Sequence, residues 1–170
     1  MKYIKQHKNF FDSDVFCELI NYSSSLWHFN EDKFNIFGTN HVWPENIVMD
    51  SNTILIHKIQ TDAEIFRKIS GQLQKKINIV PVSSLIYFFT PGSHIPWHSD
   101  NIKLQGAISV YLNDTWDKNN GGLFHYDIEG EIKTIVPEKN LAIQQFGIVP
   151  HSVSCLTRNS QVRVSLQIWY

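Results

Sequence analysis

The chain has 170 residues, enough for one domain with a single hydrophobic core. Fifteen basic residues against sixteen acidic ones leave a net charge of -1, which argues against nucleic acid or an anionic membrane as a partner. No segment approaches the roughly 18 consecutive apolar residues of a membrane span, and the first residues lack an apolar signal segment, so we expect a cytosolic protein. Cys17 and Cys155 lie far apart and predict reduced thiols.

The first 80 residues predict two helices. Asp12 or Ser13 can cap the first helix, and Thr61 or Asp62 precedes the second. The apolar residues at helical spacing are Val15, Phe16, Leu19 and Ile20 in the first helix, and Ile65, Phe66, Ile69 and Leu73 in the second. The two lysines at 75–76 suit the C-terminal end of the second helix, where a positive charge interacts favourably with the helix dipole.

The chain beyond residue 80 is predicted to be all β. Its short β-type segments are residues 84–89, 106–112, 121–126, 131–136, 141–146 and 161–170, with one more candidate strand earlier, at residues 53–59. Turns rich in Pro, Gly, Asn and Asp separate the segments. This pattern predicts a mainly β (α+β) fold, a sandwich or a double-sheet jelly roll, with the N-terminal helices packed on one sheet. We expect one domain, residues 1–170, with a helical support region (1–80) and a jelly-roll core (81–170).

Three side chains can form a metal site. His98 and Asp100 are two residues apart, so in an extended chain both project from the same face. His151 follows Asp100 by 51 residues and is the candidate third ligand. Two histidines and one carboxylate on one face leave open positions on the ion, an arrangement that suits iron(II), whereas zinc more usually takes a tetrahedral site.

A His-x-Asp pattern alone is weak evidence for a metal site, because it also arises by chance. The other two histidines considered as ligands have simpler explanations. His94 precedes His98 by four residues, but the nearby prolines and Gly92 disfavour the helix that this spacing would need, so we do not expect His94 to bind a metal. His125 lies in a β-type segment and suits a core, surface or pocket-wall position.

The second half of the chain resembles a known enzyme family. FTPGSHIPWHSDN, SVYLNDTW, NNGGLF, PHSV and RVSLQIW follow one another between residues 85 and 170. In this combination the chain is similar to the iron(II)/2-oxoglutarate dioxygenases of the prolyl 4-hydroxylase-like branch, whose core is a double-stranded β-helix, or jelly roll. The resemblance implies His98, Asp100 and His151 as iron(II) ligands, 2-oxoglutarate and O2 as co-substrates, and catalysis by residues that include Arg163.

The resemblance also implies that Arg163 binds the distal carboxylate of 2-oxoglutarate, with Ser165 adding a hydroxyl. A guanidinium donates two parallel hydrogen bonds to a carboxylate, although an isolated arginine on a strand is more often a surface charge. The apolar neighbours of Arg163 predict a buried strand, where an unpaired charge would be costly. A tyrosine often completes this site in the family, but the usual spacing falls on Phe89, so Tyr87 or Tyr111 is the candidate.

The family implies hydroxylation of an unactivated C–H bond in an amino-acid or peptidyl side chain, with release of succinate and CO2. The expected partner is therefore a small-molecule or peptidyl substrate, and Trp97, Asn101 and Trp116 adjoin the site and could shape its pocket, whereas Trp169 suits the core. Two alternatives are a cupin-type metalloprotein without 2-oxoglutarate and a non-catalytic jelly-roll binding module. Arg163 argues against the first, and the intact ligand set argues against the second. The sequence indicates no oligomeric state.

Overall fold

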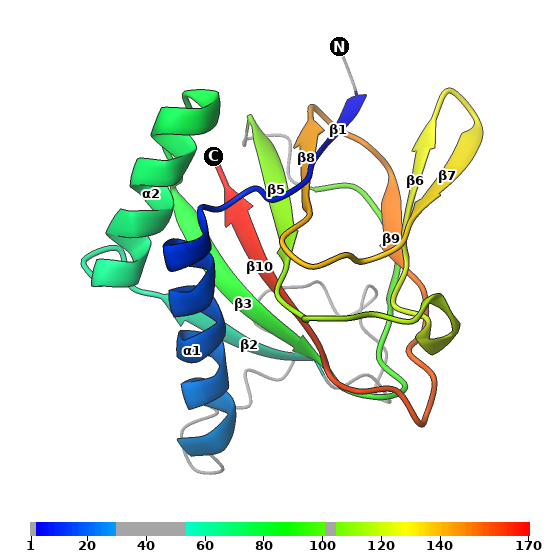
Figure 1. Cartoon of the computed structure of the whole chain (residues 1–170). Coiled ribbons are helices and arrows are strands. Elements are labelled where there is room, and N and C mark those ends of the chain that lie inside the picture. Colours follow the sequence, from blue (N-terminus) through cyan, green and yellow to red (C-terminus); the bar gives the residue numbers. More distant parts are fainter. Residues whose placement is uncertain (1–2, 30–53, 101–104) are drawn as a thin grey trace.

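Two antiparallel β-sheets face each other, and two helices pack on the outer face of the larger sheet (Figure 1). This computed structural model describes residues 3–29, 54–100 and 105–170. The elements in chain order are β1 (Tyr3–His7), α1 (Ser13–Phe29), β2 (Ile54–Ile59), α2 (Glu64–Ile77), β3 (Ser83–Phe89), β4 (Ile95–His98), β5 (Gly106–Tyr111), a 3-10 turn (Lys118–Asn120), β6 (Phe124–Ile128), β7 (Glu131–Ile135), β8 (Ala142–Phe146), β9 (His151–Val153) and β10 (Arg163–Trp169). The predicted jelly-roll class with helices on one sheet is confirmed.

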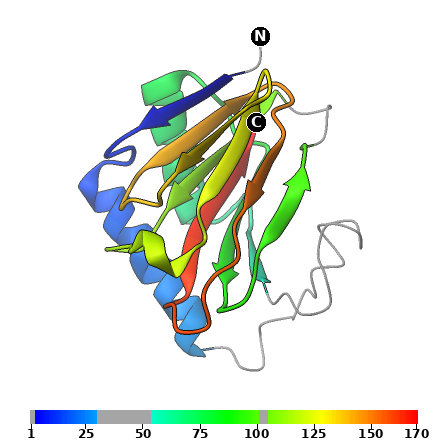
Figure 2. The same ribbon diagram turned by 90° about the vertical axis from the view of Figure 1, so that its right-hand side faces the viewer.

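The larger sheet has the strand order β1-β8-β5-β10-β3-β2, and the smaller one has the order β4-β9-β6-β7. Figure 2 views the molecule from the side of the smaller sheet. Residues directly opposite one another in an antiparallel pair share a face, so the register of β10 with β3 and β5 assigns the side chains of all three strands to one face or the other. One face meets the helices, and the other meets the smaller sheet.

The helices cover an apolar face. Leu19 of α1 and Ile69 and Leu73 of α2 are fully buried, and they pack in one cluster with Ile86 of β3 and Leu166 of β10. A fully buried aliphatic side chain contributes about 1.5–3 kcal/mol relative to leaving it exposed, so this cluster is a large part of what joins the helices to the jelly roll. Within the described residues, neither helix combines the length and apolar character that a membrane crossing needs.

The ends of α2 differ in how well the sequence predicted them. The N-cap is Ala63, which supplies no side-chain hydrogen bond, rather than Thr61 or Asp62. At the other end Lys75 lies in the last turn as expected. Asn78 caps that end in the left-handed conformation, with a φ of 56°, and its backbone N–H bonds to carbonyls of the last turn.

Most predicted strands are present with small shifts, but three strands were not predicted: β1, β4 and β9. The predicted strand at 121–126 begins instead at Phe124. Gly121 and Gly122 before it have φ values of 72° and 63°, a conformation that a regular strand does not contain. The candidate strand at 53–59 is β2; its first predicted residue, at position 53, lies outside the described residues.

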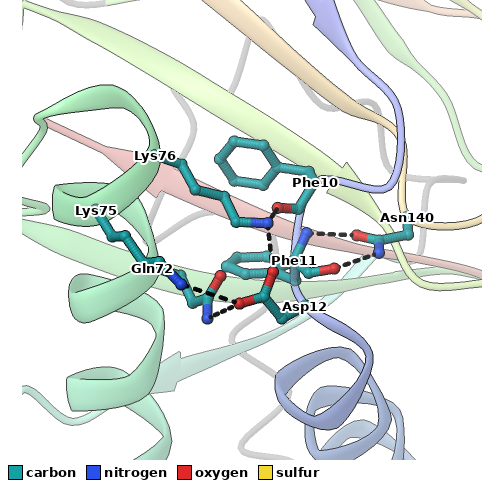
Figure 3. A network of polar contacts seen from close by, with 7 residues as sticks. All are labelled: Phe10, Phe11, Asp12, Gln72, Lys75, Lys76 and Asn140. Atoms are coloured by element: carbon teal, nitrogen blue, oxygen red, sulfur yellow. Dashed lines mark hydrogen bonds and ion pairs between the residues drawn. The ribbon is translucent and has the colours of Figure 1, made fainter.

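A polar network fastens the start of α1 to both α2 and the larger sheet (Figure 3). The side-chain amide of buried Asn140 makes two hydrogen bonds with the backbone of Phe11. Its Oδ1 accepts from the Phe11 N–H at 2.9 Å, and its Nδ2 donates to the Phe11 carbonyl at 2.8 Å. The Asp12 carboxylate accepts from Gln72 at 2.8 Å and pairs with Lys76 at 2.7 Å. The hydrogen bond from Lys76 is the main reason that the pKa of Asp12 falls to about 2.

Candidate active site

The smaller sheet brings together three side chains that lie far apart in sequence. His98 ends β4 and His151 begins β9, and the two residues are directly paired across the strands, with ring centroids 4.2 Å apart. Asp100 follows just beyond β4, with its Oδ1 3.7 Å from His98 Nε2 and its Oδ2 4.0 Å from His151 Nε2. The donor atoms of all three side chains therefore converge on one region at the end of β4.

Backbone carbonyls orient the two imidazoles. His98 Nδ1 donates to the Pro96 carbonyl at 2.9 Å, and His151 Nδ1 donates to the Val149 carbonyl at 2.8 Å. A carbonyl oxygen can only accept, so the hydrogen of each neutral ring is on Nδ1 and the lone pair is on Nε2, the atom directed at Asp100. Burial lowers the pKa of His98, and the nearby His151 lowers it further, so His98 favours the neutral form that a metal requires.

The donor set fits iron(II). The described part of the chain contains one group of three or more His, Cys, Asp or Glu side chains that could hold a metal ion together. The group consists of His98, Asp100 and His151, whose ligand atoms all lie within 4.8 Å of one another. Two imidazoles and one carboxylate are the donors of the facial triad of non-haem iron(II) oxygenases, which leaves positions for other ligands. His94 and His125 are not in this group; His125 instead bonds Thr134 at 2.8 Å.

Arg163 lies on the opposite sheet as a buried cation. It begins β10, is only 2% exposed, and its guanidinium carbon lies 4.5 Å from the ring centroid of Phe89 and 4.8 Å from that of Tyr111. Within the described residues, its Nε and Nη1 atoms make no hydrogen bond. Burial lowers its pKa, but an arginine keeps its charge at any physiological pH. A buried charge with two unused donors fits a carboxylate ligand, such as the distal end of 2-oxoglutarate.

Both candidate tyrosines face the same way as Arg163. Ser165 is directly paired with Tyr87 on β3 and with Tyr111 on β5, so all three point toward the smaller sheet. The ring of Tyr111 touches the guanidinium, and burial raises the pKa of its hydroxyl while the guanidinium acts in the opposite direction. Phe89, at the position where the family often has a tyrosine, contributes its ring face instead.

A cavity connects the two halves of the site. The space between its lining atoms is about 370 Å³, a figure that includes space open to solvent. The residues that line it are Tyr87, Phe89, Ile95, His98, Ser109, Phe124, His151, Val153, Arg163, Ser165 and Gln167. His98 and His151 therefore line the same space between the sheets as the predicted carboxylate-binding residues Arg163 and Ser165.

The residues expected to shape the pocket differ in where they lie. Trp116 donates its indole N–H to the Gly121 carbonyl and packs beside the cavity, Trp97 is 48% exposed, and the third pocket candidate, at position 101, lies outside the described residues. Trp169 packs against the core as expected. The sequence prediction missed Ser109 and Gln167. The alternation that placed Ser165 with Arg163 could have identified Gln167, two residues further on.

Comparisons with known proteins agree with this geometry. The family model of the 2OG-Fe(II) oxygenase superfamily matches residues 83–170, which is 88 of the 170 residues. The search of curated proteins found no significant match.

Similar solved structures cover nearly the whole chain. A prolyl-4-hydroxylase from Pseudomonas putida has a TM-score of 0.75 and 18% identity, with 99% of this chain and 92% of that chain covered. A prolyl hydroxylase from Trichoplax adhaerens, in complex with a hypoxia inducible factor peptide fragment, has a TM-score of 0.76 and 16% identity, covering 98% and 82%. AviO1 from Streptomyces viridochromogenes Tue57 has a TM-score of 0.64 and 14% identity, covering 99% and 89%. The fold is shared with these proteins, and the family match shows that the chain belongs to the 2OG-Fe(II) oxygenase superfamily, whose members use Fe(II), 2-oxoglutarate and O2.

Proposed function

We propose that this oxygenase hydroxylates an unactivated C–H bond in an amino-acid or peptidyl side chain. The observation that carries the proposal is the pairing, across one cavity, of a His-Asp-His group with a buried arginine that has unused donors. Similarity to two prolyl hydroxylases, one of them solved with a peptide, supports an amino-acid or peptidyl substrate.

In this proposal each part of the site has a role. His98, Asp100 and His151 hold the iron, and the carbonyls of Pro96 and Val149 fix the imidazole orientations. Arg163 and Ser165 bind the distal carboxylate of 2-oxoglutarate, with Tyr111 or Tyr87 adding a hydroxyl. Iron held by these residues would supply the chemistry that couples decarboxylation of 2-oxoglutarate, to succinate and CO2, to insertion of one oxygen atom of O2 into a C–H bond.

The surroundings of the cavity favour a protected reaction. Buried apolar side chains of the smaller sheet line much of it: Ile95, Val153 and Phe124 are all at most 6% exposed. Exclusion of water strengthens the interaction between Arg163 and a carboxylate, and limits side reactions of an oxidising site. In this proposal the residues of the chain bind and orient the iron and 2-oxoglutarate and limit the access of water, while the iron and its co-substrate supply the oxidising power.

Two further features belong to the proposal. The core shared between the helices and β3 and β10 supports a single domain over residues 1–170. Two exposed free thiols, Cys17 and Cys155, support a reducing, cytosolic location.

The test is anaerobic addition of Fe(II) and then 2-oxoglutarate, followed by a screen of amino acids and peptides for succinate release. We expect iron alone to bind, 2-oxoglutarate then to produce the weak visible charge-transfer band of its iron chelate, and one substrate class to raise succinate release above the uncoupled background. Iron binding without the band would support a cupin-type protein instead. Failure to bind iron would support a non-catalytic binding module.

A further inference from the structure

Two polar residues in the cavity have no role in the site as described so far. Ser109 of β5 and Gln167 of β10 are directly paired and face the smaller sheet, on the same face as Ser165. The Ser109 hydroxyl donates to Gln167 Oε1 at 2.6 Å, and Ser109 is only 6% exposed. The burial of these polar groups costs free energy, which this hydrogen bond compensates in part.

The smaller sheet shows at which end of the cavity the metal ligands lie. Gly122 lies against Arg163: a Cβ on this glycine would be 2.9 Å from Arg163 Cδ. Phe124, two residues further along, packs in a cluster with Tyr111. The next residue on that face of β6 is paired with His151. Along β6, therefore, the chain runs from the arginine, past Phe124, to the metal ligands.

The larger sheet runs through the cavity in the same order. Arg163 lies beside Gly122, and Ser165 is paired with Tyr111, which packs against Phe124. Gln167 is the next inward residue of β10. It follows Ser165 on this face of β10 as the residue paired with His151 follows Phe124 on β6, and this shared order puts its side chain toward the metal ligands, away from the arginine. It lines the same cavity as His98 and His151.

The hydrogen bond from Ser109 determines what the amide offers to a ligand. Because Oε1 of Gln167 already accepts from the hydroxyl, the Nε2 group is the part of the amide left to face the cavity. No residue in the described ranges accepts a hydrogen bond from this Nε2. The amide is thus a fixed donor at the metal end, while Arg163 supplies donors at the other end.

Taking the proposed function as given, we propose that Gln167 binds the 1-carboxylate of 2-oxoglutarate, the end that meets the metal, and that Ser109 positions its amide. The co-substrate is then bound at both ends from a single strand: by Arg163 at its distal carboxylate and by Gln167 at its keto-acid end. A cavity with donors at both ends selects a dicarboxylate and disfavours a cationic or wholly apolar ligand.

The experiment compares the wild type with Gln167→Met and Ser109→Ala in the iron-loaded protein under anaerobic conditions. Gln167→Met keeps a similar volume and removes the donor. A hydrogen bond to a charged group is worth roughly 1.5–3 kcal/mol, so we expect the Kd for 2-oxoglutarate to rise roughly 10- to 100-fold. The wavelength of the charge-transfer band should also shift, because the changed contact lies at the chelating end. Ser109→Ala should have the same effects to a smaller extent.

Gln145→Met is the matched control. Gln145 is a buried glutamine of the same sheet that does not line the cavity, so this variant should leave both the Kd and the band unchanged. Iron affinity should be unchanged in every variant. Equal binding by wild type and Gln167→Met, a loss of affinity with no band shift, or an equal loss in the control would each overturn the assignment of Gln167. If the wild type binds iron but not 2-oxoglutarate, the proposed function itself fails, and this assignment fails with it.

Discussion

The two faces of β10 carry different kinds of residue: one face is apolar and packs under the helices, and the other is polar and lines the cavity. Leu166 and Ile168 are fully buried in the apolar cluster under the helices. Arg163, Ser165 and Gln167, which alternate with them, face the cavity between the sheets. A single strand therefore contributes both to the core under the helices and to the proposed ligand site. Substitutions at neighbouring positions of β10 should change either the stability of the fold or the binding of 2-oxoglutarate, but not both.

The largest expected effect is on the metal. His151→Ala should abolish measurable iron(II) binding, because it removes one of the three proposed ligands. Its thermal unfolding in the absence of metal should change far less, since β9 retains its ladder with β4 and β6. Calorimetric iron titration and a melting curve test this together. Iron affinity equal to that of the wild type would place the metal elsewhere.

Arg163→Ala should weaken 2-oxoglutarate binding by at least about 100-fold, since removal of one partner of a buried charge pair costs about 3–5 kcal/mol. Iron affinity should stay within a few-fold of the wild type, because Arg163 belongs to the opposite sheet from the proposed metal ligands. Titration of the iron-loaded protein with 2-oxoglutarate measures the change. Parallel losses of iron and 2-oxoglutarate binding would indicate a misfolded variant.

Leu166→Ala tests the other face of the strand. Removing a fully buried leucine should lower the free energy of unfolding by about 2–5 kcal/mol. The folded fraction should still bind 2-oxoglutarate with wild-type affinity, because Leu166 packs toward the helices. Urea unfolding, and a binding titration at low temperature, give the two numbers. A large change in 2-oxoglutarate affinity would show that the two faces are not separable.

A smaller effect is expected where a loop holds Arg163 in place. In Gly122→Ala the new Cβ would lie 2.9 Å from both Arg163 Cδ and Leu156 Cδ1. The arginine must shift, and we expect roughly tenfold weaker 2-oxoglutarate binding, equivalent to about 1.4 kcal/mol. Gly130→Ala is the control: its φ of 83° imposes similar strain, but no atom lies near its Cβ. Equal binding losses in both variants would rule out displacement of Arg163 as the cause.

The smallest effect concerns the network that joins α1 to α2. The pKa of Asp12 is about 2 in the folded protein, below its usual 3.8, so the folded state binds this proton less readily. The resulting stabilisation is present above pH 3.8 and is lost as the pH falls toward 2. The stability difference between wild type and Asp12→Asn should therefore shrink over this range in acid titrations followed by circular dichroism. A difference that stays constant would show that the ion pair with Lys76 does not stabilise the fold.

The sequence predicted the features that depend on local pattern. Alternation along β10 placed Arg163 and Ser165 on one face, and helical periodicity located both helices. It did not predict β4 or β9, which are only four and three residues long and are stabilised by pairing with each other. The edge strand β1 was missed because its sequence, YIKQH, has little apolar character.

The contacts around Arg163 could not be predicted from the sequence alone. Tyr87 and Tyr111 both flank Ser165, and only the packing shows that Tyr111 touches the guanidinium. The contact of Gly122 with Arg163 depends on how the loop before β6 folds back, which no spacing in the sequence encodes.

The most direct test of the central claim is a crystal structure of the protein with Mn(II), a redox-stable substitute for iron, and 2-oxoglutarate, grown without oxygen. We predict one ion bound by His98, Asp100 and His151, and one 2-oxoglutarate whose distal carboxylate pairs with Arg163. An ion held by other residues, or a dicarboxylate that does not reach Arg163, would contradict the account.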